Sequence, residues 1–371
     1  MTERRDVVIA GGGIIGLALA WELTRRGRHV LVLEASEGSA DAAARVAAGM
    51  LAPVSEVDLA HPDLTRLSIA SAEMYADWAY DLEAASGLDV AYETTGTLIV
   101  ALHRDHLAEI EHLRAFQHDR GLAAETLTRG ELRDAEPALA PSVVGGIRVP
   151  DRQIDPRRVL AALRAALARA GAEVCDGARV QRIESGLVTY ELDGHTTQVE
   201  AMQVVIASGA WSGAIEADVA LPMRPVKGLV LRLRGERLLQ HVVRTPDVYL
   251  VPRAYGELVV GATMEERGFD RTQRAGDVYD LLLEATRALP GVRELELSEV
   301  CVGFRPALRD HLPAIGEVAP GVFVATGHFR DGVLLTPVTA RLLSAVMCGD
   351  APDPLLAPYA PSRFAAVEVT R

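Results

Sequence analysis

The sequence predicts an α/β protein that begins with a strand, a helix and a second strand, and three stretches near its start indicate this. DVVIA at 6–10 is apolar throughout, as a central parallel strand should be. LALAWELTRR at 17–26 has helical apolar spacing, and Gly27 is a suitable stop. HVLVLEA at 29–35 is the next strand.

The turn between the first strand and the helix has the pattern G-x-G-x-x-G, formed by Gly11, Gly13 and Gly16, and Glu34 lies 18 residues beyond it. Gly11 permits the tight turn, Gly13 lets a diphosphate approach the backbone, and Gly16 lets helix and strand pack closely. The helix N-terminus offers free N–H groups and the positive end of its dipole. A glutamate at this place accepts hydrogen bonds from ribose hydroxyls. Together these features predict a dinucleotide-binding site.

The composition limits the other possibilities. The chain of 371 residues suffices for about two domains, and 49% apolar with 24% charged residues is ordinary for a globular protein. A net charge of −13 without a basic run argues against nucleic acid as a partner. Three scattered cysteines suggest neither a disulfide framework nor a metal site. Because no apolar leader or membrane-length stretch is present, we expect a cytoplasmic protein that binds no membrane.

The glycine motif leaves open whether the dinucleotide is NAD or FAD. AAARVAAGMLAPVSEV at 42–57 has small side chains that would let the backbone lie along a diphosphate and a flavin, with an alanine-rich helix as the alternative. GVFVATGHFRDGVLLTPVTARLLSAVM at 321–347 predicts a further strand, a glycine loop and an amphipathic helix. We expect the helix N-terminus near Asp331 and Gly332 to face the flavin pyrimidine ring. A second such loop favours FAD.

Two more elements and one arginine complete the pattern. DPRRVLAALRAALARAGAEV at 155–174 is a helix that Asp155 can cap, and QVVIASGAWS at 203–212 is an apolar strand that meets a glycine turn. CVGFRPALRDHLPAIG at 301–316 carries a strand that presents Arg305 and is followed at once by Pro306, which cannot donate to a sheet ladder. Arg305 is either one half of a surface ion pair or a binding group.

These stretches resemble, in order and spacing, the D-amino-acid oxidase superfamily of FAD-dependent oxidoreductases, and within it the glycine oxidase family. The resemblance runs nearly end to end and is weakest over about residues 86–150. The motifs that carry it are GGGIIG with Glu34, AAGMLAP, VVIASGAWS, RPVKG, YLVPR, VVGATM, GFRP and GHFRDGVLLTP.

The resemblance implies two interleaved domains and FAD bound without a covalent bond. A Rossmann-like FAD-binding domain of the glutathione-reductase type would comprise residues 1–85, 150–215 and 300–371. An antiparallel-sheet substrate-binding domain, residues 86–149 and 216–299, would roof the flavin. Cys301 lies two residues early for the cysteine tether of the sarcosine oxidase branch. Carried over by position, the cofactor contacts are Gly11, Gly13, Ile14, Ile15, Gly16, Glu34, Ala35, Ala43, Ala44, Ala48, Gly49, Met50, Val180, His328, Phe329, Arg330, Asp331, Gly332, Val333 and Leu334.

The resemblance also gives Arg305 a role, because the arginine of this strand pairs with the substrate carboxylate. A planar guanidinium matches a carboxylate through two parallel hydrogen bonds. Tyr249 is implied as a second carboxylate contact, with a core aromatic as the alternative. Met264 is implied as a pocket residue, with ordinary packing as the alternative. Arg330 is implied as a further polar contact, and His328 fits a structural role better than a catalytic one.

The implied activity is oxidative deamination of glycine, sarcosine or a D-amino acid. The Cα hydrogen leaves as hydride for flavin N5, the imine hydrolyses to a 2-oxo acid and ammonia, and dioxygen is reduced to hydrogen peroxide. The resemblance further implies a role in thiamine thiazole biosynthesis, with thiazole synthase as an imine acceptor, and a homotetramer as the assembly. No metal is implied.

Four positions depart from the glycine oxidase pattern. They are Arg45 in place of a serine, Leu229 in place of a polar residue such as glutamine or glutamate, Asp247 in place of a histidine at the pocket mouth, and the ALRD sequence after Pro306. These leave the substrate open among glycine, a larger D-amino acid, sarcosine and other secondary amines. Two rival interpretations are a dehydrogenase that passes electrons to a quinone or another carrier, and a flavin-binding scaffold without turnover. The presence of both Arg305 and Tyr249 argues against the scaffold.

Overall fold

The computed structural model describes residues 5–58, 60–184, 186–217 and 221–364, and its first sheet confirms the α/β class. The strand order is β17-β18-β11-β1-β2-β8. β10 pairs with the N-terminal part of β11, and β9 pairs with β10. The strands β18, β11, β1, β2 and β8 are parallel, and β17, β10 and β9 pair antiparallel. Their bounds are β1 Arg5–Ala10, β2 Val30–Leu33, β8 Glu173–Cys175, β9 Arg179–Glu184, β10 Leu187–Leu192, β11 His195–Ile206, β17 Ala314–Ala319 and β18 Val322–Thr326.

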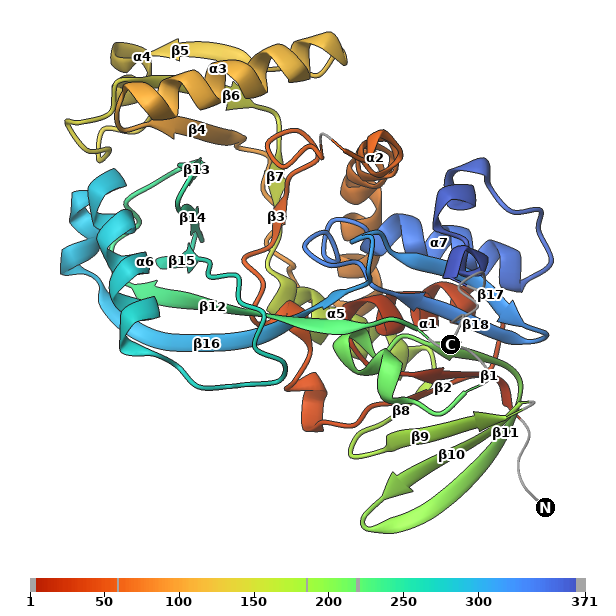
Figure 1. The fold of residues 1–371 in the computed structure, drawn as a ribbon. Coiled ribbons are helices and arrows are strands. Elements are labelled where there is room, and N and C mark those ends of the chain that lie inside the picture. The colour runs from red at the N-terminus through yellow and green to blue at the C-terminus, as the bar shows by residue number, and fades with distance from the viewer. Residues whose placement is uncertain (1–4, 59, 185, 218–220, 365–371) are drawn as a thin grey trace, which may run out of the picture.

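Four helices share one hydrophobic core with this sheet, and Figure 1 shows α1, α5 and α7 beside its strands. The helices are α1 Ile14–Arg25, α2 Pro62–Ser86, α5 Pro156–Arg169 and α7 Thr336–Met347. The apolar positions of α5 recur at helical spacing, so Leu160, Leu163 and Leu167 all face the core. The expected cap is present, because the Asp155 carboxylate accepts hydrogen bonds from the backbone N–H groups of Arg157 and Arg158.

The second sheet is antiparallel except for one pair, and its strand order is β16-β12-β15-β14-β13-β4-β6-β5. Figure 1 shows it as a separate lobe, with α3 and α4 beside β4–β6 and with α6 beside β12, β15 and β16. The bounds are β4 Thr97–Ala101, α3 Arg104–Asp119, β5 Glu125–Thr128, α4 Arg129–Ala135, β6 Gly145–Val149, β12 Arg224–Arg234, β13 Val242–Arg244, β14 Tyr249–Pro252, β15 Glu257–Gly261, α6 Ala275–Ala288 and β16 Glu296–Ala307.

The strand that carries Arg305 belongs to this second sheet. β16 pairs with β12 along its whole length, with Arg305 opposite Val226 and Ala307 opposite Arg224. The predicted domain boundary at residue 300 would therefore cut a continuous hydrogen-bonded ladder. We propose the boundary after Ala307 instead, and the three-part first domain otherwise as expected.

The structure decides one open alternative and corrects one expectation. Residues 42–57 do not form an alanine-rich helix, but a short 3₁₀ turn at Ala43–Arg45 and a two-residue strand, β3 Met50–Leu51, which pairs with β7 Arg152–Gln153. The last helix starts at Thr336 rather than near Asp331. Phe329 has φ +46, a left-handed conformation that interrupts a helix, and Pro337 then suits the first turn of α7.

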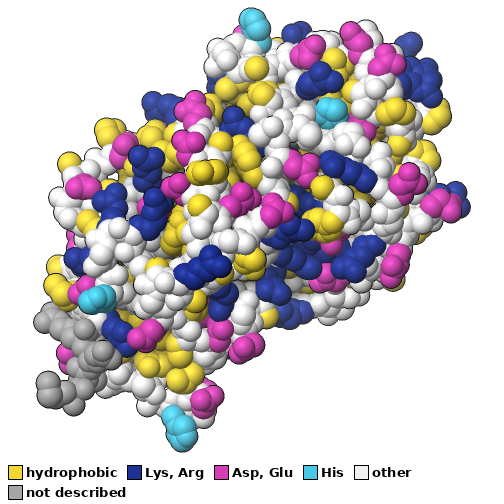
Figure 2. Space-filling view, turned by 180° about the vertical axis from the view of Figure 1, so that it is seen from behind, with side chains coloured by type: hydrophobic (Ala, Val, Ile, Leu, Met, Phe, Trp, Pro, Cys, Tyr) yellow, Lys and Arg dark blue, Asp and Glu magenta, His cyan; other side chains and the backbone are white. Residues whose placement is uncertain are grey.

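Further short 3₁₀ helices lie at Glu37–Ser39, Gly209–Ala214, Pro290–Glu294, Pro354–Tyr359 and Pro361–Phe364. Within the described ranges, no helix has the length and apolar content needed to cross a membrane. On the face shown in Figure 2, basic and acidic side chains are intermixed.

Candidate active site

A cavity of about 640 Å³ is lined by residues of both sheets. Its walls come from the turn after β1, the segment 33–50, the end of β11, the strands β12 and β16, and the segment 325–333. This volume lies within the range of about 300–1,000 Å³ that is usual for small-molecule sites. The residues predicted to bind a dinucleotide and those predicted to bind a substrate therefore meet in one space.

The glycine turn forms one end of the cavity. Gly11 has φ +116, and a Cβ there would lie 2.5 Å from the Ala207 carbonyl oxygen, so no other residue fits. A Cβ on Gly13 would meet no atom within 4 Å, because this position faces the open cavity. Gly16 lies against the Gly11 carbonyl oxygen, where a Cβ would approach to 2.0 Å. The N-terminus of α1 is thus open to a ligand phosphate.

Glu34 lies at the carboxyl end of β2 and lines the same end of the cavity. Its carboxylate accepts hydrogen bonds from Gly12 N at 2.7 Å, Ser36 N at 2.8 Å and Ser36 Oγ at 2.6 Å. Only 8% of the residue is exposed. These donors fix the carboxylate beside the glycine turn, where ribose hydroxyls would lie in a dinucleotide complex.

The small-residue segment 42–50 is held in place by arginines from other elements. The buried Arg253, on the loop after β14, donates to the Ala48 carbonyl oxygen and to Gln153 Oε1. Arg157 Nε donates to the Arg45 carbonyl oxygen at 2.7 Å. The segment therefore presents its backbone and alanines to the cavity in one conformation.

Arg305 and Tyr249 line the other end of the cavity, and two glycines make room for their side chains. A Cβ on Gly228 of β12 would lie 2.3 Å from Arg305 Nη1, and one on Gly261 of β15 would lie 2.3 Å from the Tyr249 hydroxyl. Arg305 Nη1 also donates to the Thr263 carbonyl oxygen at 3.1 Å. The two polar side chains are thus laid flat on the sheet with fixed orientations.

Burial raises the pKa of Tyr249 to about 12, although the Arg305 guanidinium opposes this shift. The phenol is therefore protonated at neutral pH and can donate a hydrogen bond. A guanidinium and a phenolic O–H at one end of a cavity form a site for a carboxylate.

The segment 328–334 forms a third wall, and α2 holds it from behind. Ser71 Oγ donates to the Leu334 carbonyl oxygen at 2.6 Å, and the Tyr75 hydroxyl donates to the Val333 carbonyl oxygen at 2.5 Å. His328 is 3% exposed, its Nε2 lies 3.1 Å from Thr339 Oγ1, and burial lowers its pKa to about 3. Burial and the nearby Glu56 raise the pKa of Asp331 to about 7. His328 is thus neutral.

Most of the predicted site residues line the cavity. Those that do are Gly11, Gly13, Ile14, Ile15, Glu34, Ala35, Ala43, Ala44, Ala48, Gly49, Met50, Val180, Tyr249, Arg305, His328, Phe329, Arg330, Gly332 and Val333. Gly16, Asp331 and Leu334 are not among the lining residues. Met264 does not line it, because its side chain points to solvent and the residue is 64% exposed.

Several lining residues escaped the sequence analysis. Glu56 reaches the cavity from the loop after β3 and forms an ion pair with Arg244 at 3.2 Å. Trp211, Phe269 and Arg271 form another part of the wall. Gly228, which lines the cavity, and Gly261, which does not, stand inside the motifs RPVKG and VVGATM, and their role of making room for Arg305 and Tyr249 was not recognised from the sequence.

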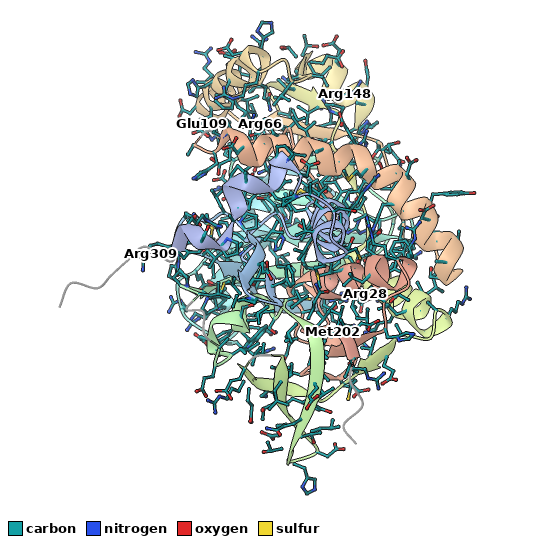
Figure 3. The ribbon with its side chains drawn as sticks, turned by 90° about the vertical axis from the view of Figure 1, so that its right-hand side faces the viewer. Arg28, Arg66, Glu109, Arg148, Met202 and Arg309 are labelled. Carbon is teal, nitrogen blue, oxygen red and sulfur yellow. The ribbon has the colours of Figure 1, made fainter. Side chains whose placement is uncertain are left out.

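The four departures lie in different surroundings. Asp247 forms an ion pair with His106 at 3.3 Å, and Leu229 is fully buried in the core of the second sheet. Arg45 donates to the Gly38 carbonyl oxygen at 3.2 Å. Arg309 of the ALRD sequence points outward from the molecule (Figure 3). None of the residues at these four departures is among the cavity-lining residues.

Cys301 lies outside the cavity lining, in a small core with Val230 and Val259, and the Arg157 guanidinium donates to its sulfur at 3.5 Å. Burial, with the Glu299 carboxylate as the next cause, raises the pKa of its thiol to about 11. This position and protonation state disfavour a covalent link to a flavin. No group of side chains in the described ranges is suited to hold a metal ion.

The residues present fit FAD. The open Gly13 position and the α1 N-terminus suit a diphosphate, Glu34 suits a ribose, and the alanine-lined wall leads toward Arg305, with space for a flat ring. The residues that would hold FAD are therefore the glycine turn, Glu34, the segment 42–50 and the segment 328–334.

Comparisons with known proteins agree with this assignment. The chain matches the FAD dependent oxidoreductase (DAO) family model over residues 6–346. It is 34% identical over 368 residues to the bifunctional protein ThiO/ThiG of Nostoc sp., an alignment that covers 97% of this chain and 55% of that protein. The chain thus spans about half the length of that relative. It is 35% identical over 352 residues to the glycine oxidase of Geobacillus kaustophilus, with 93% of each covered.

Solved structures give the same result. The crystal structure of glycine oxidase from Geobacillus kaustophilus matches with a TM-score of 0.90 at 34% identity, covering 98% of this chain and 99% of that one. The crystal structure of iminodiacetate oxidase from Chelativorans sp. BNC1 matches with a TM-score of 0.85 at 26% identity, covering 96% and 98%.

Proposed function

The chain belongs to the DAO family of FAD dependent oxidoreductases, and on this premise we propose that it oxidises a small amino acid, glycine foremost, at the cavity between its two sheets. The overall reaction converts glycine, dioxygen and water into glyoxylate, ammonia and hydrogen peroxide. FAD, when bound, supplies the hydride acceptor and passes the electrons to dioxygen.

The observation that carries this proposal is the placement of Arg305 and Tyr249 at one end of the cavity. The Arg305 guanidinium, held by the Thr263 carbonyl oxygen, binds the substrate carboxylate through its remaining N–H groups. The protonated Tyr249 hydroxyl donates a further hydrogen bond to it. Holding the carboxylate at these two points orients Cα toward the flavin wall, which is the main contribution such a site makes to the rate.

Glu56 supports an amino acid rather than a simple acid as substrate. Its carboxylate lines the cavity and is fixed by Arg244, so the cavity carries acceptors as well as the donors of Arg305 and Tyr249. An amino acid has a carboxylate for the donors and an amine for an acceptor such as Glu56. A second carboxylate on the nitrogen, as in iminodiacetate, would approach Glu56 with like charge and be disfavoured.

No strong protein base is required near Cα, and the cavity wall offers none. His328 is neutral and hydrogen-bonded to Thr339, so its role is to hold the segment 328–334. The amine must lose its proton before the hydride leaves, and solvent can accept that proton at the open side of the cavity.

The proposal extends to the pathway, the assembly and the location of the protein. The fusion named in the Nostoc relative supports a role in thiamine thiazole biosynthesis, with thiazole synthase receiving the imine. Homotetramer formation rests on the family resemblance alone. A cytoplasmic location agrees with three free cysteines, since disulfides are rare in reducing compartments.

A second candidate function is the oxidation of a secondary amine such as sarcosine. It is favoured by the match to iminodiacetate oxidase, an enzyme named for a secondary amine. A dehydrogenase that uses another electron acceptor would have the same site geometry.

An air-equilibrated peroxide assay on the yellow purified protein tests the proposal against glycine, sarcosine, D-alanine, D-proline, iminodiacetate and L-amino acids. Peroxide with glycine supports it, and peroxide with secondary amines alone supports the second candidate. If reduction of the flavin occurs without peroxide, the acceptor is not dioxygen. If no amine reduces the flavin, the proposal is refuted.

Arg305→Ala tests the carboxylate-binding role separately. The variant should keep its yellow colour, because Arg305 is not expected to hold FAD, and its KM should rise steeply. Loss of two charge-assisted hydrogen bonds, about 1.5–3 kcal/mol each, predicts a fall in kcat/KM of about 10²- to 10⁴-fold. Unchanged kinetics would place the carboxylate contact elsewhere.

A further inference from the structure

The loop between β15 and α6 leaves the second sheet and contributes to the wall of the cavity, and none of the family motifs in this sequence includes it. Residues 266–274 of this loop are called the strap here. Phe269 and Arg271 of the strap line the cavity together with Asp41, Trp211 and Phe304. The strap thus brings side chains from the second sheet into the cavity wall.

Both ends of the strap are fastened. Before it, Glu265 exchanges backbone hydrogen bonds of 2.9 and 3.0 Å with Lys227 of β12. The Lys227 side chain is fully buried, lies 3.2 Å from Glu265 Oε1 and donates to the Thr272 carbonyl oxygen at 2.8 Å. Gln273 Nε2 donates to the Val300 carbonyl oxygen of β16 at 2.8 Å. A buried lysine with satisfied partners makes this anchor costly to break.

The middle of the strap packs on aromatic residues of the cavity wall. Phe269 stacks on Trp211, with ring centroids 5.1 Å apart and an interplanar angle of 20°. It also meets Phe304 of β16 edge to face at 5.2 Å. Such pairs contribute about 0.5–1.5 kcal/mol each beyond area burial. Phe269 therefore fixes where the next residues of the strap lie.

Arg271 of the strap contacts Asp41 and the Phe304 ring. Its Nη2 lies 2.6 Å from Asp41 Oδ1, and its guanidinium lies 5.5 Å from the Phe304 ring. Asp41 follows the short helix Glu37–Ser39, whose Ser39 hydroxyl donates to the Gly12 carbonyl oxygen at 2.5 Å. The guanidinium is thus linked, through Asp41, to the segment that Ser39 fastens to the glycine turn.

The charges lining the cavity show why a cation is useful there. The basic side chains in the lining are Arg179, Arg271, Arg305 and Arg330, and the carboxylates are Glu34, Asp41 and Glu56. Arg305 lies at the substrate end, and Arg330 lies on the wall formed by residues 328–334. At the glycine turn, Glu34 and Asp41 would repel a diphosphate, and Arg271 offsets this repulsion.

We propose that the strap closes over the dinucleotide end of the cavity and that Arg271 binds the FAD diphosphate, with Phe269 and Trp211 shielding it from water. Arg271 then shares its guanidinium between Asp41 and the phosphate oxygens, which its five N–H groups permit. Release of FAD requires the strap to lift from Trp211. The inference concerns the cofactor and stands whichever amine is the substrate.

The test is the rate of FAD release from the holoenzyme, followed by the rise in flavin fluorescence after dilution. Arg271→Ala should release FAD about tenfold faster, which is the effect of losing one charge-assisted hydrogen bond at a partly exposed site. Arg271→Lys keeps the charge, so its rate of FAD release should stay close to that of the wild type. Arg267→Ala is the matched control, because it removes a charge from the same strap outside the cavity lining, and its release rate should equal that of the wild type.

Asp41→Asn separates a phosphate contact from a mere ion pair. If Arg271 binds the diphosphate, removal of the competing carboxylate should slow FAD release or leave it unchanged. If Arg271 acts only through Asp41, both variants should release FAD equally fast, and this result would overturn the proposal. Competition with ADP gives a second readout: Arg271→Ala should weaken ADP and FAD by the same factor and leave riboflavin binding unaffected. Equal loss of riboflavin, or equal release rates in Arg271→Ala and Arg267→Ala, would also overturn it.

Discussion

Gly228→Ala is the substitution that tests most directly how the fold positions Arg305. A Cβ at residue 228 would lie 2.3 Å from Arg305 Nη1, 2.8 Å from Cζ and 2.9 Å from Nη2. Ordinary contact begins at 3.4 Å, so the guanidinium must move by about 1.1 Å, the difference between 3.4 and 2.3 Å. Its 3.1 Å hydrogen bond to the Thr263 carbonyl oxygen would then be lost.

The expected effect is on binding rather than on folding. A displaced guanidinium can no longer make both hydrogen bonds to the substrate carboxylate, and one such bond contributes about 1.5–3 kcal/mol. At about 1.4 kcal/mol per tenfold change, kcat/KM should fall by about 10- to 150-fold, mainly through KM. The clash is with the end of a flexible side chain, so the free energy of unfolding should change by less than about 1 kcal/mol.

The assay is steady-state peroxide formation on FAD-saturated protein, with the best substrate from the amine series, alongside urea unfolding. Gly276→Ala on α6 is the matched control, because a Cβ there meets no atom within 4 Å. An unchanged KM in Gly228→Ala would refute the placement of the carboxylate site at Arg305. An equal loss of activity in the control would show that the effect is not specific to position 228.

Three further predictions concern single side chains of the site. Tyr249→Phe should raise KM by about 10- to 150-fold, the loss of one hydrogen bond to a charged acceptor. Because the pKa of Tyr249 is raised to about 12, the wild-type KM should show no inflection near pH 10 from this group. An inflection that disappears in the variant would contradict this. His328→Gln should flatten the dependence of the free energy of unfolding on pH. Burial lowers the pKa of His328 from 6.5 to about 3. The stability that the neutral side chain contributes is therefore present above pH 6.5 and is lost as the pH falls toward 3, at up to about 1.4 kcal/mol per pH unit. An equally steep loss in urea unfolding of both proteins would count against it. Met264→Ala should change KM by less than about twofold, because the residue is 64% exposed and outside the cavity lining, and a large rise would show that Met264 closes over the bound substrate.

The sequence alone was sufficient where the physical requirement is local. The tight turn with φ +116 at Gly11 and the close packing at Gly16 exclude larger side chains, and Gly13 leaves space for a diphosphate, so the pattern could be recognised from residue types. Asp155 followed by a proline predicts a helix start for the same reason, and the structure has it. The family motifs then placed Arg305 and Tyr249 in one site, and both side chains line the cavity.

Only the tertiary structure decided what depends on contacts between distant segments. Gly228 and Gly261 look like ordinary strand glycines, and their function appears only when β12 lies beside β16 and β15 lies beside β14. Met264 belongs to a matching motif, yet the backbone at this point turns its side chain to solvent. The sequence left open whether 42–57 is an alanine-rich helix, and arginines from the second sheet and from α5 bind carbonyl oxygens of this segment, which forms a short 3₁₀ turn and a two-residue strand instead. The strap carries no local signal, because its place depends on a lysine 45 residues away from Thr272 and on an aromatic stack with Trp211. Local steric requirements depend on neighbouring residues and can be recognised in the sequence, whereas the burial and pairing of side chains from separate strands are properties of the folded chain.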